Sequence, residues 1–216
     1  MPLLLLDLDD TLLDRAGPFR AWGERFLADV GAPASDIDWL VSNDADGLTD
    51  RWDLADALRH RYGLLVPSAD LVEELHDGVL AHTRLDPLVA CALRIAHGAG
   101  WVPVVVSNGA VRQHEAKIRG TGLDRYVADW VISEEAGFGK PNPRIFELAA
   151  RRAGTTLRGA WMVGDGPEGD IGGAAAVGLP SVWLHRGRVW ADPRCAPTVT
   201  VDGVLAAVAA VLAGAG

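Results

Sequence analysis

Acidic residues directly follow the first apolar run of the sequence, and they are the first candidates for chemistry. The run from Leu3 to Leu6 leads into Asp7-Leu8-Asp9-Asp10-Thr11. Residues two apart in an extended backbone point to the same side, so Asp7 and Asp9 face one site while Asp10 points away. Two carboxylates this close repel each other unless a cation lies between them. The pair suits one nucleophile or metal ligand and one acid or base, whereas a turn that caps the next segment is the better interpretation of Asp10.

A second polar group follows another apolar run. Ser107-Asn108-Gly109 comes directly after Val102 to Val106. A hydroxyl, an amide and a permissive glycine at a strand-to-helix junction can present hydrogen-bond donors to an anion. An ordinary helix N-cap made by Ser or Asn explains the same residues equally well.

Lysine is rare in this chain, which draws attention to where it occurs. Of the 20 basic residues, 18 are arginine, and only Lys117 and Lys140 are lysine. Lys140 lies in Gly139-Lys140-Pro141-Asn142-Pro143, where the prolines stiffen the backbone before a predicted helix. We expect its compact ammonium to neutralise a phosphate or a carboxylate. For Lys117, which has charged neighbours, we expect a solvated side chain.

Two further acids flank a glycine-rich loop. Asp165 follows the apolar residues Trp161 to Val163, and Asp170 stands where the next helix is predicted to begin. Carboxylate oxygens suit a hard cation such as magnesium. We predict that Asp165 binds a metal and that Asp170 caps the helix or hydrogen-bonds to the metal ligands.

The elements that position these residues alternate between strand and helix. Apolar runs without polar alternation are typical of strands buried on both faces of a parallel sheet. The predicted strands are 3–8, 101–107, 130–133, 160–164, 181–184 and, more weakly, 198–201, and the predicted helices are 88–99, 111–121, 143–153, 171–177 and 204–212. This alternation predicts an α/β fold with a doubly wound, mostly parallel sheet. Ligands of such sheets bind at the carboxyl ends of the strands, where all four candidate loops lie.

One long segment interrupts the alternation. Residues 15–85 contain no convincing strand but do contain amphipathic segments at 19–30, 52–62 and 69–82. Such a stretch is too long for a crossover connection. We therefore predict a core of residues 1–14 and 86–216 with a small inserted helical domain of residues 15–85.

Composition narrows the partners and the compartment. The chain has 216 residues, a hydrophobic content of 49% and a formal charge of −9. That charge disfavours nucleic acid and anionic lipid as partners. The four leucines at 3–6 lack a preceding basic segment and are followed by aspartates, unlike a signal peptide or a membrane span. Cys91 and Cys195 are far apart and fit reduced thiols, so we expect a cytoplasmic protein.

The order and spacing of the motifs resemble those of a known family. They are similar to the four sequence motifs of the haloacid dehalogenase-like (HAD) hydrolase superfamily across the whole predicted core. The residues that carry the resemblance are Asp7-Leu8-Asp9-Asp10-Thr11, Ser107-Asn108-Gly109, Lys140-Pro141, and Gly164-Asp165 with Asp170. The predicted insertion resembles the cap that many members carry. The stretch from Val131 to Asn142 is similar to small-molecule phosphatases, with house-cleaning nucleotidases and acylneuraminate phosphatases nearest in character.

The resemblance implies a magnesium-dependent phosphatase that hydrolyses a small phosphorylated metabolite, and we expect a nucleotide or a sugar phosphate. Asp7 would attack phosphorus and form an aspartyl-phosphate. Asp9 would protonate the leaving oxygen and then deprotonate the water that releases phosphate. Ser107, Asn108 and Lys140 would bind the phosphate oxygens. The protein would act as a monomer or a homodimer.

The same resemblance implies a magnesium site. Mg²⁺ would be bound by the Asp7 carboxylate, the Asp9 backbone carbonyl and Asp165, with Asp170 outside the ligand set. A dianionic phosphate can approach these acids only if a metal and a lysine offset their charge. One departure from the family pattern affects Asp170: Gly166-Pro167 stands where members often have Ser or Thr after the first acid.

Three alternatives use the same scaffold. A phosphomutase would use the same residues but return the phosphoryl group to the sugar. A 2-haloacid dehalogenase is disfavoured because dehalogenases of the superfamily lack the second acid, here Asp9. A non-catalytic module would bind a phosphate ligand without turning it over. Substrate choice would reside in the inserted helices, where Arg51 is our candidate; Arg20, Trp39, Trp52 and His60 are better explained as core or solvated residues.

Overall fold

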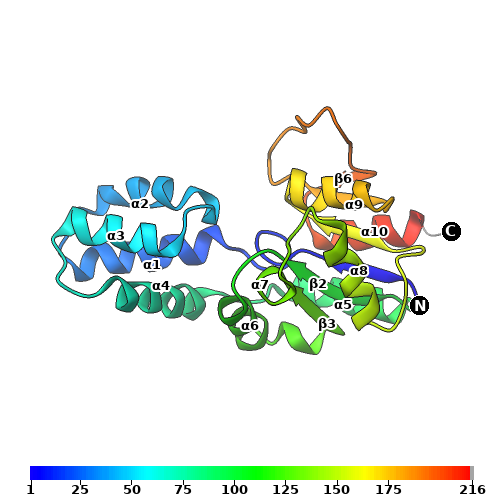
Figure 1. The fold of residues 1–216 in the computed structure, drawn as a ribbon, viewed down its shortest axis with the longest axis horizontal. Helices are drawn as coiled ribbons and strands as arrows, with labels where there is room; N and C mark the ends of the chain where they lie inside the picture. Colours follow the sequence, from blue (N-terminus) through cyan, green and yellow to red (C-terminus); the bar gives the residue numbers. More distant parts are fainter. Residues whose placement is uncertain (215–216) are drawn as a thin grey trace. The chain divides into compact units, whose positions relative to one another are not determined.

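Six strands form the centre of the fold in the computed structural model, which describes residues 1–214 (Figure 1). The strands are β1 (Leu3–Leu6), β2 (Val102–Ser107), β3 (Asp129–Ile132), β4 (Trp161–Gly164), β5 (Ser181–Leu184) and β6 (Val199–Val201). Their order is β3-β2-β1-β4-β5-β6, and every neighbouring pair is parallel. The predicted doubly wound α/β fold is therefore confirmed, and β1 lies at the middle of the sheet.

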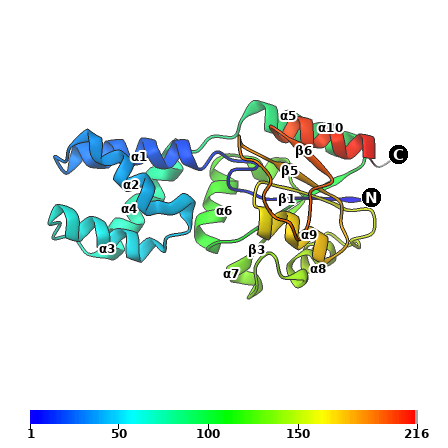
Figure 2. The same cartoon turned by 90° about the horizontal axis from the view of Figure 1, so that it is seen from above.

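Alternation along β1 explains why its leucines form a strand buried on both faces. Leu4 and Leu6 pack into one hydrophobic cluster, and Leu3 and Leu5 pack into another. The first cluster includes residues of α5 (Pro87–Gly98) and α10 (Val204–Gly214), and the second includes residues of α8 (Pro143–Arg152) and α9 (Gly173–Ala176). Figure 2 shows these two helix pairs on opposite sides of the sheet. The two clusters thus cover both faces of β1.

The remaining helices of the core connect these layers. They are α6 (Val111–Gly120), η3 (Leu123–Arg125), α7 (Ser133–Ala136) and η4 (Pro167–Gly172), the last of which is a single π-helical segment. The sequence predicted one helix over 171–177, whereas helical backbone begins at Pro167. Proline is favoured in a first helical turn because it has no N–H to satisfy there.

The chain divides into two compact units. We call Met1–Leu13 with Arg84–Gly216 the core unit and Asp14–Thr83 the helical unit. The helical unit contains α1 (Ala16–Asp29), η1 (Ala34–Asp36), α2 (Ile37–Asp44), η2 (Ala45–Gly47), α3 (Arg51–Tyr62) and α4 (Ser68–His82). Its own hydrophobic cluster is built around Phe19, Trp22 and Phe26. The sequence analysis did not predict α2, whose eight residues are short for a recognisable helical period.

The two ends of the helical unit connect to adjacent points of the core unit. Leu13, the last core residue before the insertion, forms an isolated antiparallel bridge with Leu85 just after it. Asp86 then caps α5 by accepting a hydrogen bond from the Leu88 N–H at 2.8 Å. Within residues 1–214, no helix has the length and apolar character needed to cross a bilayer.

Candidate active site

Three acids and a lysine meet at the carboxyl end of the sheet. Asp7 follows β1, Asp165 and Asp170 follow β4, and Lys140 precedes α8. Lys140 Nζ lies 2.6 Å from Asp7 Oδ1 and 2.6 Å from Asp170 Oδ1. One carboxylate oxygen from each of the three acids lies within 4.8 Å of the other two. We refer to Asp7, Asp165 and Asp170 as the carboxylate cluster.

Burial perturbs the protonation of the carboxylate cluster. Desolvation raises the pKa of Asp7 to about 7, against the attraction of Lys140 and with help from the charge of Asp170. Burial, followed by the charge of Asp7, raises the pKa of Asp165 to about 6. Burial also raises the pKa of Asp170. Desolvation opposes the charged form of Lys140, but the charges of Asp170 and Asp7 outweigh it and raise the lysine pKa. The site therefore has an excess of negative charge that one ammonium does not neutralise.

Asn108 fixes the backbone of Lys140. Its Oδ1 accepts a hydrogen bond from the Lys140 N–H at 2.7 Å, and its Nδ2 donates to the Lys140 carbonyl at 2.8 Å. A Cβ at Gly139 would lie 2.6 Å from Asn108 Oδ1, so glycine is needed for this approach. The side-chain amide of Asn108 thus holds the backbone of Lys140. The contact of Asn108 with phosphate stays a prediction.

Ser107 is the last residue of β2 and is buried. Because β2 pairs in parallel with β1, Ser107 emerges at the same end of the sheet as Asp7. Its neighbouring loop is anchored to the segment after β3, since the Gly109 N–H donates to Ser133 Oγ at 2.9 Å and the Val111 N–H donates to Glu134 Oε2 at 2.7 Å. These bonds fix the backbone around Ser107.

The prediction for Lys117 is wrong. Its side chain is buried rather than solvated, and its Nζ lies 2.7 Å from both oxygens of Asp9. Charged neighbours at Glu115 and Arg119 concealed the pattern, because His114, Lys117 and Ile118 form the buried face of α6 at helical spacing. This helical spacing in the sequence could have identified Lys117 as a buried residue. The scarcity of lysine in the chain pointed to it as well.

His114 also lies beside Asp9. Its Nε2 lies 3.7 Å from Asp9 Oδ2. Burial lowers the pKa of His114 to about 4, although the charge of Asp9 opposes this, so the imidazole is neutral near pH 7. The contacts of Asp9 thus include one with the Lys117 ammonium and one with a neutral ring. Sequence reasoning did not single out His114.

Two arginines of the segment between β5 and β6 lie near the site, where Arg188 contacts Asp165 and Arg186 contacts Asp10. Arg188 Nη2 lies 2.9 Å from Asp165 Oδ2 and 2.6 Å from the Asp165 carbonyl oxygen. Arg186 Nη1 donates to the Asp10 carbonyl oxygen at 2.7 Å. No local motif marks either arginine, and the fold alone brings them here. They add positive charge to the side of the site opposite Lys140 along the sheet.

Asp170 was predicted to cap the helix or to hydrogen-bond beside the metal ligands, and it lies next to Lys140 and the other two acids of the carboxylate cluster. It is buried, accepts a hydrogen bond from Lys140, and accepts another from the Gly166 N–H at 2.8 Å through Oδ2. A Cβ at Gly164 would lie 2.2 Å from Asp170 Oδ2, so the glycine at the end of β4 makes room for this carboxylate. The departure at Gly166-Pro167 therefore still supplies a backbone donor to Asp170.

Arg51, our candidate for a residue that selects the substrate, forms an ion pair inside the helical unit. Its Nη1 lies 2.5 Å from Asp44 Oδ1, and Arg15 binds the other oxygen of the same carboxylate. Asp44 is buried, so both guanidinium groups compensate its charge. Any contact of Arg51 with a substrate remains a prediction.

The fold and this site define the class of the protein. A parallel sheet with helices on both faces binds its ligand at the carboxyl ends of its strands, where buried acids and a lysine are found here. The family model of the haloacid dehalogenase-like hydrolases matches residues 1–178. The chain belongs to this family and is a hydrolase.

Individual relatives agree with that assignment. The chain is similar to a phosphoserine phosphatase of Thermus thermophilus, at 29% identity over 93% of this chain and 95% of the relative. It is also similar to a glyceraldehyde 3-phosphate phosphatase of Methanopyrus kandleri, at 39% identity over 56% of this chain and 52% of the relative. Among solved structures, the HAD-hydrolase YfnB of Bacillus subtilis matches 97% of this chain and 98% of its own with a TM-score of 0.76 and 20% identity. The last similarity concerns the fold alone.

Proposed function

We propose that the protein is a magnesium-dependent phosphatase that hydrolyses small phosphate monoesters through an aspartyl-phosphate on Asp7. The observation that carries the proposal is the contact between the Lys140 ammonium and the buried Asp7 carboxylate inside the carboxylate cluster. A nucleophilic carboxylate can meet an anionic phosphate only where cations offset both charges. The names of the two relatives support phosphate monoesters as the substrates.

The residues divide the reaction into two transfers. Asp7 Oδ attacks phosphorus, the bond between phosphorus and the leaving oxygen breaks, and Asp9 gives that oxygen a proton. Asp9 then takes a proton from water as the water attacks the phosphorus of the aspartyl-phosphate, which releases phosphate and restores Asp7. Lys140 and Ser107 bind the phosphate oxygens during both steps.

The donor set fits a divalent cation. Asp7, Asp9, Asp165 and Asp170 bring four carboxylates, and the cationic side chains that contact them include Lys117, Lys140 and Arg188. A dianionic substrate would leave this site strongly negative without a further cation. Oxygen ligands of this kind suit Mg²⁺, which Asp7, Asp165 and the Asp9 carbonyl would hold. When bound, the ion supplies positive charge to the phosphate oxygens.

A panel of phosphate esters assayed with and without Mg²⁺ tests the proposal. The panel contains p-nitrophenyl phosphate, phosphoserine, glyceraldehyde 3-phosphate, nucleoside monophosphates and sugar phosphates. We expect Mg²⁺-dependent phosphate release from at least one ester, and no release by Asp7→Asn. Beryllium trifluoride, which mimics a phosphoryl group on a carboxylate, should bind the wild-type protein and not Asp7→Asn. Absence of both turnover and beryllium trifluoride binding would instead indicate a non-catalytic module.

The same panel separates the alternative reactions. A phosphomutase would convert a sugar phosphate into its isomer with little free phosphate. A haloacid dehalogenase would release halide from 2-haloacids without metal. Asp9 and its contact with Lys117 favour the phosphatase, because the second acid is needed to move a proton to and from an oxygen leaving group.

The helical unit is the proposed cap of the enzyme, and it would select the leaving group. Comparing kcat/KM for Arg51→Gln across the panel tests whether Arg51 contributes. A change in the order of preferred esters supports contact with the substrate. A uniform fall for all esters supports a role confined to Asp44. The half-buried free thiols Cys91 and Cys195 fit the proposed cytoplasmic location.

A further inference from the structure

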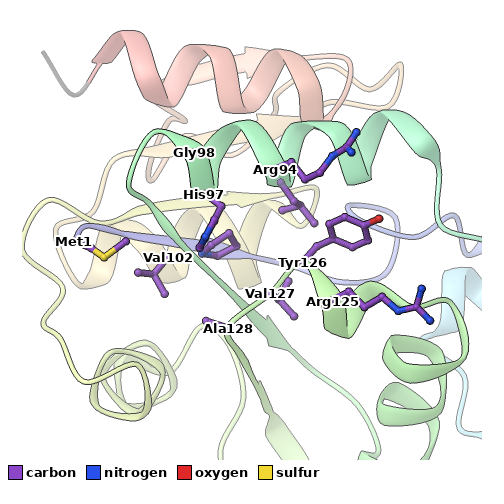
Figure 3. Close-up of a pocket in the computed structure, with 11 residues that line it drawn as sticks. Met1, Arg94, His97, Gly98, Val102, Arg125, Tyr126, Val127 and Ala128 are labelled. Atoms are coloured by element: carbon purple, nitrogen blue, oxygen red, sulfur yellow. The ribbon is translucent and has the colours of Figure 1, made fainter.

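A pocket lies at the amino end of the sheet, far from the carboxylate cluster. Its volume is about 550 Å³, within the usual range for small-molecule sites. Met1, Val102 and Ala128 line it, at the starts of the first three strands of the chain (Figure 3). Val102 and Ser107 begin and end β2, so a rise of about 3.3 Å per residue separates the two sites by about 16 Å. A molecule in this pocket would not contact the substrate.

The floor of the pocket is apolar and belongs to the core. Leu93 and Val127 line it and pack into the same hydrophobic cluster as Leu4 and Leu6 of β1. The Tyr126 ring lies beside them and is partly buried. A rigid wall of this kind favours a ligand with an apolar body, because little side-chain entropy is lost on binding.

The charged residues of the pocket are all basic. Arg94 and His97 come from α5, Arg125 comes from η3, and no acid lines the pocket. The chain as a whole has a formal charge of −9, so a wholly basic lining is contrary to its average surface. Figure 3 shows Arg94 and Arg125 extending on the same side of the pocket, with Tyr126 between them.

The two arginines are available for a ligand. Most arginines of this chain bind an acid or stack on a ring, but within residues 1–214 the side chains of Arg94 and Arg125 make no hydrogen bond or ion pair. Guanidinium groups bind carboxylate, sulfonate and phosphate groups through charge-assisted hydrogen bonds. An anionic group at this end of the pocket would therefore meet complementary charge.

We propose that this pocket binds a small organic anion, with its apolar body on Tyr126 and Val127 and its anionic group on the side of the pocket that carries Arg94 and Arg125. The site is separate from the active site in place and in ligand. It requires an apolar body as well as a charge, so inorganic phosphate alone is not its ligand.

Two dyes that differ in one charged group test this proposal. 8-Anilino-1-naphthalenesulfonate has an apolar ring system and a sulfonate, and N-phenyl-1-naphthylamine has the same rings without the sulfonate. Fluorescence titration should give one saturable site that prefers the sulfonate. Arg94→Gln/Arg125→Gln should weaken sulfonate binding about tenfold and leave the neutral dye unchanged, because the charge-assisted bonds are lost.

A second pair of arginines provides the matched control. Arg151 and Arg158 are exposed and make no side-chain ion pair or hydrogen bond within the described part of the chain. Arg151→Gln/Arg158→Gln changes the net charge equally and should keep wild-type dye binding. Ala128→Trp, which fills the pocket from its rim, should weaken both dyes. Unchanged far-UV circular dichroism and an unchanged Tm would show that all three variants are folded.

Several results would overturn the proposal. Equal losses in the two arginine pairs would show that only net charge matters. Unchanged binding in Ala128→Trp would place the dye elsewhere. Displacement of the sulfonate dye by orthovanadate would place it in the active site and not at the amino end of the sheet.

Discussion

At the scale of single residues, the site depends on charges that water hardly reaches. The exposed fractions of Asp7, Lys140 and Lys117 are 8%, 7% and 5%. A buried charge is costly unless a partner compensates it, and removing one partner leaves the other uncompensated. Each charged residue of the site is therefore expected to act through its neighbours as well as on the substrate.

Lys117→Met should reduce turnover without preventing substrate binding. Lys117 Nζ donates to both oxygens of Asp9, so its loss would release the carboxylate that we propose as the acid and base. We expect kcat to fall about 10²-fold, the usual weight of one acid-base group, with a small change in KM. Steady-state kinetics with p-nitrophenyl phosphate and Mg²⁺ provide the measurement. The double variant Asp9→Asn/Lys117→Met should be no slower than Asp9→Asn, whereas additive losses would mean that Lys117 acts independently of Asp9.

Asp7→Asn should stabilise the metal-free protein in a pH-dependent way. Burial raises the pKa of Asp7 from 3.8 to about 7, so between these values the folded state holds a proton that the unfolded state has released. The free energy of unfolding therefore falls as pH rises from about 4 to about 7. Asparagine does not ionise, so this decrease is absent in Asp7→Asn. We expect the free energy of unfolding of the variant to exceed that of the wild type by about 2–4 kcal/mol at pH 8 and by little at pH 4. Denaturant titrations in EDTA at both pH values measure it, and an equal gain at both would refute the linkage.

At the scale of elements, the loops after the strands hold the side chains of the candidate active site in place by close backbone approach. Gly164 ends β4 directly beside the Asp170 carboxylate, and Gly139 lies against Asn108. Asn108 in turn joins the loop after β2 to the backbone of Lys140. Small residues at these positions are thus part of the site although they carry no functional group.

Gly164→Ala should displace Asp170 and with it the second contact of Lys140. The added Cβ would lie 2.2 Å from Asp170 Oδ2, so the carboxylate or the strand end must move. We expect a loss of stability of about 1–3 kcal/mol, as for other overpacked sites, and a fall in kcat/KM. Thermal unfolding and kinetics measure both effects. Gly98→Ala is the control, because no atom lies within 4 Å of its added Cβ and α5 should gain slightly from alanine. Unchanged kinetics in Gly164→Ala would separate Asp170 from the reaction.

The strand ends are also where sequence reasoning succeeded and where it stopped. A strand that is buried on both faces, such as Leu3–Leu6, is recognisable in the sequence as a continuous apolar run. The first polar residue after such a run lies at the carboxyl edge of the sheet. That logic led to Asp7, Ser107 and Asp165. It did not lead to Lys117 or Arg188, because their nearness to the acids depends on how α6 and the segment after β5 pack in three dimensions.

The role of Asn108 illustrates the same limit at one residue. Its position after β2 was predictable, but its side-chain partner is the backbone of Lys140, 32 residues further along the chain. Spacing in the sequence gives no information about such a contact. Pairing across loops has to be observed in the structure.

At the scale of the whole molecule, the chain combines a net charge of −9 with a carboxylate cluster that needs compensation. Mg²⁺ should therefore stabilise the folded protein by binding to it and not to the unfolded chain. At an ion concentration 100 times its dissociation constant, the gain is about 2.7 kcal/mol, or a rise in Tm of roughly 5–10 °C for a chain of this size.

Thermal unfolding with MgCl₂ or EDTA checks this rise, and Asp165→Asn should abolish it. Asp124→Asn is the matched control, since Asp124 is exposed on η3 and should leave the shift intact. A full shift in Asp165→Asn, or an equal shift with NaCl of the same ionic strength, would mean that the stabilisation is a general salt effect.

The bridge between Leu13 and Leu85 has a consequence for the history of such a protein. The insertion leaves the core unit after Leu13 and returns to it just before Leu85, and these two residues are paired. A turn of a few residues could therefore join them directly. The insertion from Asp14 to Thr83 can therefore be lengthened, shortened or replaced without any change in the order of the strands. Proteins that share this core unit can therefore differ in the inserted helices while the residues at the strand ends stay the same.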